Sequence, residues 1–463
     1  MSGSQPHNIV VVVADSLRYD SVHRDGASAT PYMSAHGVRF SQARSAGCWT
    51  LPATASMFTG LLPHEHGATS QTRDVDQGRP TLPELLQDKG YVTRQLTNNV
   101  ATTHIFGLDR GFDDVERHWK SLVVRGNPLY NCLVVFGKPR MRRRFLKGDW
   151  LMNRMSEDME ASRSWVVSAC EGQLDRARAI LNEHRERKEP LFLFVNLMDT
   201  HFPYQVAPQF QLTAPSLWTR LKELHSLYHL VNQTHLLREE SPIKSDGLLR
   251  LRERQYGAWD RVASMIDDFV AEVHGRKDEN NTVVFCSDHG DNFGEGDWEY
   301  HFSNVTDAGN RVPCIWLKGG QSMPGQIDTP VSMRDTYSSL CSEVGVTDQL
   351  AGTQLFHLAD NPERSSSVTE AYWYNNRGKT RPEYRVNQFS FVSGDRRFVY
   401  RAGVWLSSEI AADTEERPLD SMGLQDAIED CGASAERKNQ LRAQFESYRA
   451  FSDRIEPSRS HAA

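Results

Sequence analysis

The sequence lacks any long apolar run. Its longest, residues 9–14, has six residues, which is typical of a buried strand and far short of the ~20 residues that a membrane-spanning helix needs. The N-terminal stretch also lacks a basic segment followed by an apolar core and a small-residue cleavage site. We therefore expect neither a transmembrane segment nor a secretory signal.

Cysteine is sparse, and its spacing excludes two classes of protein. There are seven cysteines, with no C-x-x-C pair among them. An odd, scattered set argues against both a disulfide framework and a zinc cluster. The sequence therefore predicts a reduced protein with a cytoplasmic location.

No strong excess of charge or low-complexity tract is present either. The chain has 463 residues, of which 39% are hydrophobic and 24% charged, and its formal net charge is −7. This composition is typical of a mildly acidic globular protein, and it gives no reason to expect a nucleic-acid partner. The length is typical of roughly two or three folding units.

Continuous apolar runs open three stretches, residues 8–14, 191–204 and 281–291, and each stretch continues into aspartate or histidine. Helical patterns fall between and after them, at residues 53–62, 81–90, 163–188 and 256–274. Buried strands alternating with helices predict a doubly wound α/β fold, with a mainly parallel sheet and helices on both faces. Ligands bind at the carboxyl edge of such sheets, where the polar residues would gather.

The domain organisation is predicted from changes in composition and hydrophobic pattern along the chain. We expect a catalytic α/β domain over residues 1–360, with helical insertions at about 118–160 and 205–250. A small C-terminal α+β subdomain over 361–463 would contain a two-stranded hairpin within 389–406 and a terminal helix within 434–451. The basic segment 138–147 has no assigned role, because a solvated loop and an anion-steering surface both fit it.

Three polar residues stand directly after two of the predicted strands. Asp15 follows the first strand, where a buried carboxylate has to cap a helix, pair or bind a metal. Taken alone, helix capping is the favoured interpretation. Asp288 and His289 follow another strand, and together the three residues form an oxygen and imidazole ligand set suited to Mn²⁺, Zn²⁺ or Fe more than to Mg²⁺ or Ca²⁺.

Two further histidines, His201 and His301, also lie close to strand ends. A single histidine in such a place is more often structural than catalytic, so only their position beside the other polar residues favours a role in catalysis.

The motifs "NIVVVVADSLRYD", "TLPATASMFTGLLPHEHG", "MDTHFPY", "SDHGD" and "RVPCIWLKG" occur in an order and at separations that resemble the sulfatase family of the alkaline phosphatase superfamily. The resemblance covers residues 8–345, and the hairpin after 385 resembles the family's C-terminal subdomain. It implies a divalent metal ion beneath a nucleophile at the start of a helix. Carried over by motif, the metal ligands would be Asp15, Thr50, Asp288 and His289.

The nucleophile position departs from the family pattern C-x-P-x-R. Thr50 stands two residues before Pro52, where the family has the cysteine that becomes formylglycine, and Thr54 replaces the arginine. Cys48 lies four residues before Pro52 and is out of register. We therefore expect Thr50 to be the nucleophile, and we expect no formylglycine.

The downstream Lys-x-His segment of sulfatases is also missing, and Asn98 and Asn99 stand in that region. We take Asn99 and Thr54 as candidate substrate-binding residues. The resulting hypothesis is in-line attack by Thr50 on phosphorus or sulfur, which gives a covalent ester that is then hydrolysed. By family analogy, His201 and His301 would bind the transferred group or protonate the leaving oxygen. Asp199 and His201 could supply a second metal site as in the family's phosphodiesterase relatives, but their D-x-H spacing is shorter than the Asp-to-His spacing of those relatives, so we favour one metal.

Three functions remain open at this point. The first is a metal-dependent hydrolase of phosphate monoesters, diesters or phosphonates, because a threonine nucleophile suits phosphoryl transfer. The second is a sulfuric ester hydrolase or group transferase that uses the unmodified hydroxyl. The third is a noncatalytic binding protein with the same fold. In each case the partner is a small anionic ester, and the sequence gives no indication of the oligomeric state.

Overall fold

The computed structural model describes residues 7–76, 78–117, 169–202, 204, 222, 225–226, 241, 243–277, 279–302, 304–346, 354–361, 365–373, 386–410 and 420–455. The predicted insertion at 118–160, with its basic segment 138–147, lies outside these ranges, and so does most of the one at 205–250.

The centre of the molecule is an eight-stranded sheet with the order β11-β2-β10-β7-β1-β6-β4-β5. Strand β1 pairs in parallel with β6 on one side and β7 on the other, and β4 continues the parallel pairing. Only β10 runs antiparallel to its neighbours β7 and β2. The strands are β1 (His7–Ala14), β2 (Val38–Phe40), β4 (Val92–Thr97), β5 (Asp114–Arg117), β6 (Leu191–Leu197), β7 (Asn280–Cys286), β10 (Cys314–Leu317) and β11 (Gly325–Ile327).

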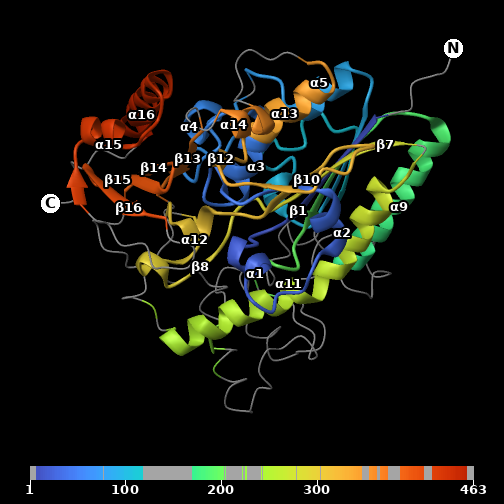
Figure 1. Cartoon of the computed structure of the whole chain (residues 1–463), viewed down its shortest axis with the longest axis horizontal. Helices are drawn as coiled ribbons and strands as arrows, with labels where there is room; N and C mark the ends of the chain where they lie inside the picture. Colours follow the sequence, from blue (N-terminus) through green and yellow to red (C-terminus); the bar gives the residue numbers. More distant parts are fainter. Residues whose placement is uncertain are drawn as a thin grey trace, which may run out of the picture.

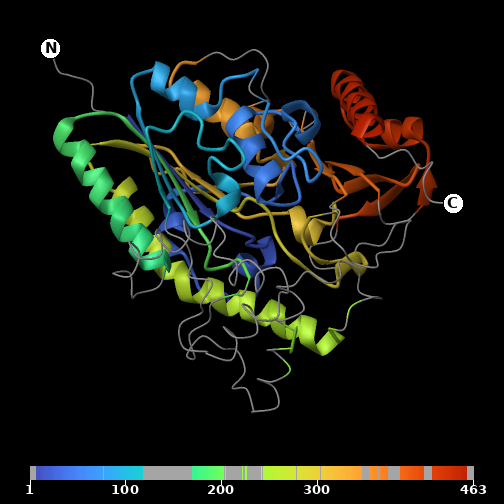
Figure 2. The ribbon, with the colours of Figure 1, turned by 180° about the vertical axis from the view of Figure 1, so that it is seen from behind.

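Both faces of this sheet are buried, as continuous apolar strands require. Side chains alternate along a strand, so residues of β1 from Ile9 onward contribute in turn to two separate apolar clusters. One cluster includes side chains of α3 (Thr50–Thr59), α5 (Leu82–Asp88) and α13 (Asp335–Glu343). The other includes those of α2 (Pro31–His36), α9 (Ala169–Arg187) and most of α11 (Ser245–His274). The predicted doubly wound sheet is therefore confirmed, with the two helical layers visible in Figures 1 and 2.

The predicted strands and helices lie close to their expected positions, with shifts at their starts. Helix α3 begins at Thr50, three residues before its predicted start. Helix α11 begins at Ser245, well before residue 256, because its apolar spacing continues into Leu248 and Leu251, which are buried. Among the described residues, no helix is long and apolar enough to cross a membrane.

A second, antiparallel sheet follows in the C-terminal part, with the order β13-β14-β15-β16-β17. The segment 389–406 was predicted as two strands, but it forms three, because a tight turn at Ala402 and Gly403 adds β16 to the hairpin. These strands are β13 (Ser367–Ala371), β14 (Gln388–Ser393), β15 (Arg396–Arg401), β16 (Val404–Glu409) and β17 (Asp420–Met422). Helices α15 (Leu424–Asp430) and α16 (Ala435–Ile455) pack against the sheet through an aromatic cluster. The boundary at residue 360 between two domains remains a prediction.

Strand β13 joins the second sheet to the segment that precedes α3. The backbone N–H of Glu370 donates to the carbonyl of Ala46 at 2.9 Å. The Glu370 carboxylate contacts the ring Nδ1 of His64 at 2.7 Å and accepts a bond from its backbone N–H at 2.9 Å. His64 belongs to α4 (Pro63–His66), directly after α3. The C-terminal sheet thus holds the α3 segment from the side away from the central sheet.

Candidate active site

Residues from three separate segments meet at the carboxyl edge of the central sheet. Asp15 follows β1, and Asp288 and His289 follow the neighbouring parallel strand β7. Thr50 is the first residue of α3, which packs on the same sheet. All four side chains are at least 97% buried. The structure therefore brings together the complete predicted metal-ligand set, although these residues are far apart in the sequence.

The Thr50 hydroxyl lies at the centre of this group. Its Oγ1 is 3.3 Å from Nε2 of His289 and 3.5 Å from Oδ2 of Asp15. The Asn99 amide donates to the same Oγ1 at 3.0 Å and to Asp15 Oδ2 at 2.7 Å. The hydroxyl is thus held against both predicted metal ligands at the N-terminus of a helix, where free backbone N–H groups and the helix dipole favour an anionic ligand.

The turn after β1 orients the carboxylate of Asp288. Ser16 has a φ of 59°, a left-handed conformation that brings its N–H to Oδ1 of Asp288 at 3.1 Å. The same Oδ1 accepts from the N–H of His289 at 2.9 Å. Oδ2 of Asp288 is buried and has no hydrogen-bond partner among the described residues. A buried carboxylate oxygen without a donor is costly, and a cation would satisfy it.

His289 has the tautomer that a metal ligand requires. Its Nδ1 is 3.0 Å from the carbonyl oxygen of Gly290, and a carbonyl only accepts, so Nδ1 carries the proton. The Nε2 lone pair consequently faces Oδ2 of Asp288 at 3.5 Å and Oδ1 of Asp15 at 3.8 Å. Such a hydrogen bond to the second nitrogen is the usual way in which proteins orient a metal-binding imidazole.

The electrostatics of the site indicate a missing positive charge. Burial, together with the nearby Asp15 carboxylate, raises the pKa of Asp288 to about 7. Burial alone would also raise the pKa of Asp15, but His201, His289 and two amide donors outweigh it and lower that pKa. For His289, neighbouring carboxylates outweigh burial and raise the pKa. Two aspartates and one imidazole within reach of one ion form a plausible divalent-metal site.

Taken alone, Asp15 was expected to cap a helix, and the structure shows that this expectation is wrong. The residue that precedes α1 (Tyr19–His23) is Arg18, and no side chain caps that helix. The Asp15 carboxylate instead accepts bonds from the side chains of Asn99, Asn196 and Ser16. A carboxylate held in place by neutral amide and hydroxyl donors suits a metal ligand better than a cap.

The two predicted catalytic histidines lie beside this group. The ring centroids of His301 and His289 are 4.5 Å apart, and those of His301 and His201 are 5.5 Å apart. His201 is also close enough to Asp15 to lower the pKa of that carboxyl. Asp199, by contrast, is paired with Arg261 at 3.4 Å. The catalytic roles of His201 and His301 remain predictions.

The remaining predicted residues differ in their positions. Asn99 binds Thr50 and Asp15 directly, so in this structure its amide orients the candidate nucleophile. Thr54 is one turn further along α3 and buried, and its role in substrate binding remains a prediction. Cys48 is 2% exposed, and burial raises the pKa of its thiol to about 12. A thiol in this state is a poor nucleophile.

Sequence reasoning missed three residues of the site. Asn196, near the end of β6, donates to Asp15 Oδ2 at 3.2 Å. Asp291 contacts Nδ1 of His301 at 2.5 Å and accepts from the Tyr204 hydroxyl at 2.7 Å. Asp291 lies three residues after Asp288 in "SDHGD", so its closeness to a predicted ligand was an available indication. No comparable sequence feature indicates that Asn196 or Tyr204 belongs to the site.

The chain is similar to known sulfatases. The Sulfatase family model matches residues 7–346. Arylsulfatase K of Xenopus laevis is 23% identical over 395 residues, which are 78% of this chain and 68% of that protein. An uncharacterized sulfatase, YidJ, of Escherichia coli (strain K12) is 23% identical over 311 residues, covering 65% of this chain and 60% of the relative.

A solved structure shares the fold across nearly the whole chain. The phosphonate monoester hydrolase of Agrobacterium radiobacter superposes with a TM-score of 0.64 at 18% identity, covering 96% of each chain. The mainly parallel central sheet and the C-terminal antiparallel sheet therefore belong to the alkaline phosphatase and sulfatase fold. With the family match over residues 7–346, this chain is a member of the sulfatase family of ester hydrolases.

Proposed function

We propose that this protein is a divalent-metal-dependent hydrolase of phosphate esters, acting on monoesters, diesters or phosphonates, with Thr50 as its nucleophile. One observation carries the proposal. The Thr50 hydroxyl stands at the N-terminus of α3, within 3.5 Å of both Asp15 and His289. The unpartnered Asp288 Oδ2 supports a cation at the same point.

The metal would be held by Asp15, Thr50, Asp288 and His289. A divalent cation there supplies Lewis acidity, which lowers the pKa of a coordinated hydroxyl and offsets charge on the ester. The chain's own groups then orient the reaction. Asn99 fixes the hydroxyl by donating to its oxygen, and the first turn of α3 presents N–H groups to the ester oxygens.

The covalent step is an in-line displacement. The Thr50 oxygen forms a bond to phosphorus while the bond from phosphorus to the leaving oxygen breaks, and the departing electron pair stays on that oxygen. The hydroxyl proton of Thr50 passes to Oδ2 of Asp15, to which the hydroxyl donates. His301 or His201 gives the leaving oxygen a proton. Water then attacks phosphorus, the Thr50 ester bond breaks and the Thr50 oxygen recovers its proton from Asp15, while the same histidine takes a proton from the water, which restores the starting state.

Hydrolysis of sulfuric esters is the second candidate, and the family match favours it. The curated relatives described above are sulfatases by name. Against it, the sequence has threonine in place of the formylglycine cysteine and lacks both the arginine and the Lys-x-His segment of that family's sulfate site. The same metal site and the same hydroxyl would serve either ester.

A substrate panel separates these candidates. Protein depleted of metal is reloaded with Mn²⁺, Zn²⁺ or Ca²⁺ and assayed on 4-nitrophenyl phosphate, bis(4-nitrophenyl) phosphate, 4-nitrophenyl phenylphosphonate and 4-nitrophenyl sulfate. We expect metal-dependent turnover, with kcat/KM highest on one of the phosphorus esters. A preference for the sulfate would replace the first candidate with the second, and no turnover of any ester with any metal would contradict both.

A further inference from the structure

Asp291 is a buried carboxylate beside the proposed metal ligands, and the mechanism above gives it no role. It is fully buried, and both of its oxygens are engaged. Oδ1 lies 2.5 Å from Nδ1 of His301, and Oδ2 accepts from the Tyr204 hydroxyl at 2.7 Å. Tyr204 follows His201 in the loop after β6, so Asp291 joins the two segments that carry the candidate catalytic histidines.

The backbone around these side chains is strained. Tyr300 and Phe302, on either side of His301, have φ values of 69° and 101°, and Tyr204 has 48°. Bulky residues are rare in this region, and such strain persists only where the surrounding structure enforces it. The Tyr300 ring stacks on His301 with a centroid separation of 3.8 Å. The loop thus holds the His301 imidazole in one orientation.

Its contact with Asp291 leaves His301 a single nitrogen for chemistry. Nδ1 is occupied by the carboxylate, and among the described residues Nε2 of His301 has no hydrogen-bond partner. The ring lies 4.5 Å from His289, centroid to centroid. A carboxylate on one imidazole nitrogen fixes the orientation of the ring while the other nitrogen transfers a proton.

A second metal ion is the competing interpretation, because His289, Asp291 and His301 also form a group within reach of one ion. The geometry argues against it. The 2.5 Å contact between Asp291 and His301 leaves no room for an ion bound at about 2.0–2.2 Å from each atom at a tetrahedral angle. In addition, Nε2 of His289 already faces the Asp15 and Asp288 carboxylates.

We propose that Asp291, held by the Tyr204 hydroxyl, is a positioning residue that directs Nε2 of His301 to the leaving oxygen of the ester. This inference rests on the proposed function and makes it more specific. In the first step, Nε2 of His301 gives its proton to the leaving oxygen as the bond from that oxygen to phosphorus breaks. The proton between Nδ1 and Asp291 stays in that hydrogen bond, and Nε2 later accepts a proton from the attacking water.

The test measures how the kcat values of D291N and Y204F depend on the leaving group of the ester. Asparagine keeps the shape of Asp291 but removes its charge. For esters of weakly acidic alcohols, which need protonation, we expect kcat of D291N to fall about 10²-fold, the usual contribution of a general acid. For 4-nitrophenyl esters, whose leaving group needs little protonation, the fall should be less than about fivefold, with KM unchanged. Y204F should show the same pattern more weakly.

The controls separate positioning from folding. Y256F removes a comparable tyrosine-to-aspartate bond, from Tyr256 to Asp20 at 2.9 Å, and should leave both classes of ester unaffected. In the double variant D291N/H301Q, the loss should equal that of H301Q alone, because both substitutions remove one function. Equal losses on both ester classes would reduce Asp291 to a structural role and overturn the proposal.

Two measurements do not depend on turnover. In proton NMR spectra, the imidazole N–H signal that disappears in H301Q should lie far downfield in the wild type and move upfield in D291N. Metal analysis should give one ion per chain in both proteins. Two ions in the wild type and one in D291N would establish the second metal site instead. If no ester is hydrolysed but the downfield signal behaves as expected, the proposed function fails while the contact stands.

Discussion

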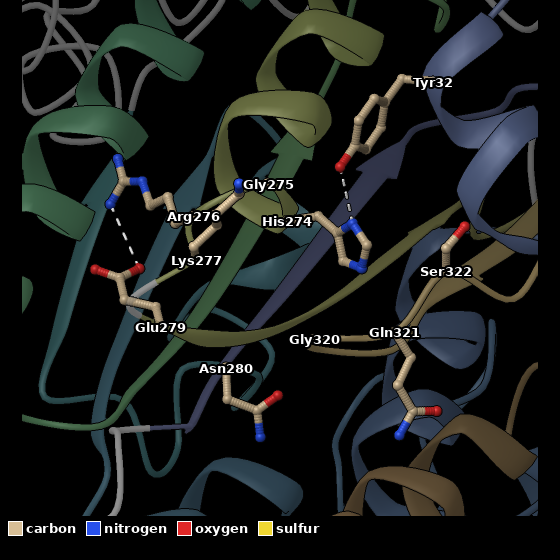
Figure 3. Close-up of a pocket in the computed structure, with 10 residues that line it drawn as sticks. All are labelled: Tyr32, His274, Gly275, Arg276, Lys277, Glu279, Asn280, Gly320, Gln321 and Ser322. Atoms are coloured by element: carbon tan, nitrogen blue, oxygen red, sulfur yellow. Dashed lines mark hydrogen bonds and ion pairs between the residues drawn. The ribbon is translucent and has the colours of Figure 1, made fainter.

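The two ends of strand β7 offer a direct comparison. Beyond its carboxyl end, Asp288 and His289 meet Asp15 and Thr50 in a fully buried group. Before its amino end lies an open pocket of about 650 Å³ (Figure 3). It is lined by Tyr32, residues 274–277, Glu279, Asn280 and residues 320–322. The strand's seven residues separate the two places by roughly 20 Å.

The pocket pairs charges of opposite sign, since Arg276 contacts Glu279 at 3.6 Å, whereas the buried group brings the two carboxylates of Asp15 and Asp288 together. In the pocket, the Tyr32 hydroxyl contacts Nδ1 of His274 at 3.0 Å, and Nε2 of that ring contacts the carbonyl oxygen of Lys318 at 3.1 Å. At the other end, Asp288 keeps an oxygen without a donor. Unbalanced buried charge, rather than the size of a cavity, marks the place where this fold has chemistry to perform.

Removing the Thr50 hydroxyl should give the largest effect. We expect T50A to lower kcat/KM by at least about 10³-fold, because the covalent step has no other acceptor in place. T50S should retain part of the activity. The matched control is T59A, which removes a hydroxyl from the other end of α3, where Thr59 bonds only to its own helix and the following turn. The measurement is kcat/KM on the best ester of the panel.

Near-normal turnover by T50A would disprove the nucleophile assignment. Mass spectrometry of the peptide 47–67 gives a separate check. We expect an unmodified Cys48, in agreement with its burial, and an ester adduct on Thr50 when a slow substrate is trapped. Formylglycine at Cys48 would instead indicate the usual sulfatase mechanism.

D288N should abolish tight metal binding. At about 100 times its Kd, a bound ion stabilises the wild type by about 2.7 kcal/mol, seen as a rise in Tm of a few degrees, and D288N should show almost no rise. Without metal, D288N should melt no lower than the wild type, because asparagine relieves the repulsion between Asp15 and Asp288. The control is D267N, since Asp267 accepts bonds from the N–H groups of Tyr32 and Met33 at the other end of the sheet.

Loss of stability together with retained metal binding is the expected result for D267N. If D288N kept the metal-induced rise in Tm, the assignment of Asp288 as a metal ligand would be wrong. Comparing D288N with D267N therefore tests whether metal binding is specific to the carboxyl end of β7 or is lost with any buried carboxylate.

Metal affinity should depend on pH through Asp288. Its pKa is raised to about 7 in the metal-free protein, so below pH 7 the carboxyl is protonated and has to lose that proton to bind an ion. Affinity should consequently fall about tenfold for each pH unit below 7 and level off above it. His289, whose pKa is also raised, would steepen the fall. Competition with a metal-binding dye measures the slope, and a flat affinity from pH 5.5 to 8.5 would contradict the assignment.

The sequence predicted that Asp15, Asp288 and His289 would lie at one edge of the sheet, because each follows a strand with a clear apolar pattern. They meet in the structure because β1 and β7 are parallel neighbours. Asp291 and Asn196 could not be predicted in the same way. Their roles depend on side-chain directions in irregular loops, where no periodicity applies and positive φ values redirect the chain. The third strand of the C-terminal hairpin was missed because its turn, at Ala402 and Gly403, directly follows a strand without a polar loop.

The smallest effect should come from the open pocket. H274A removes the central ring and its bonds to Tyr32 and Lys318, and we expect kcat/KM and metal affinity to remain within about twofold of the wild type, since nothing in the pocket contacts the Thr50 group. Stability should fall by about 1 kcal/mol for the lost hydrogen bonds, measured by denaturant unfolding. A large loss of activity in H274A at unchanged stability would show that the two ends of β7 are coupled. That result would break the distinction drawn between them, because it would place a functional residue in the pocket as well as in the Thr50 group.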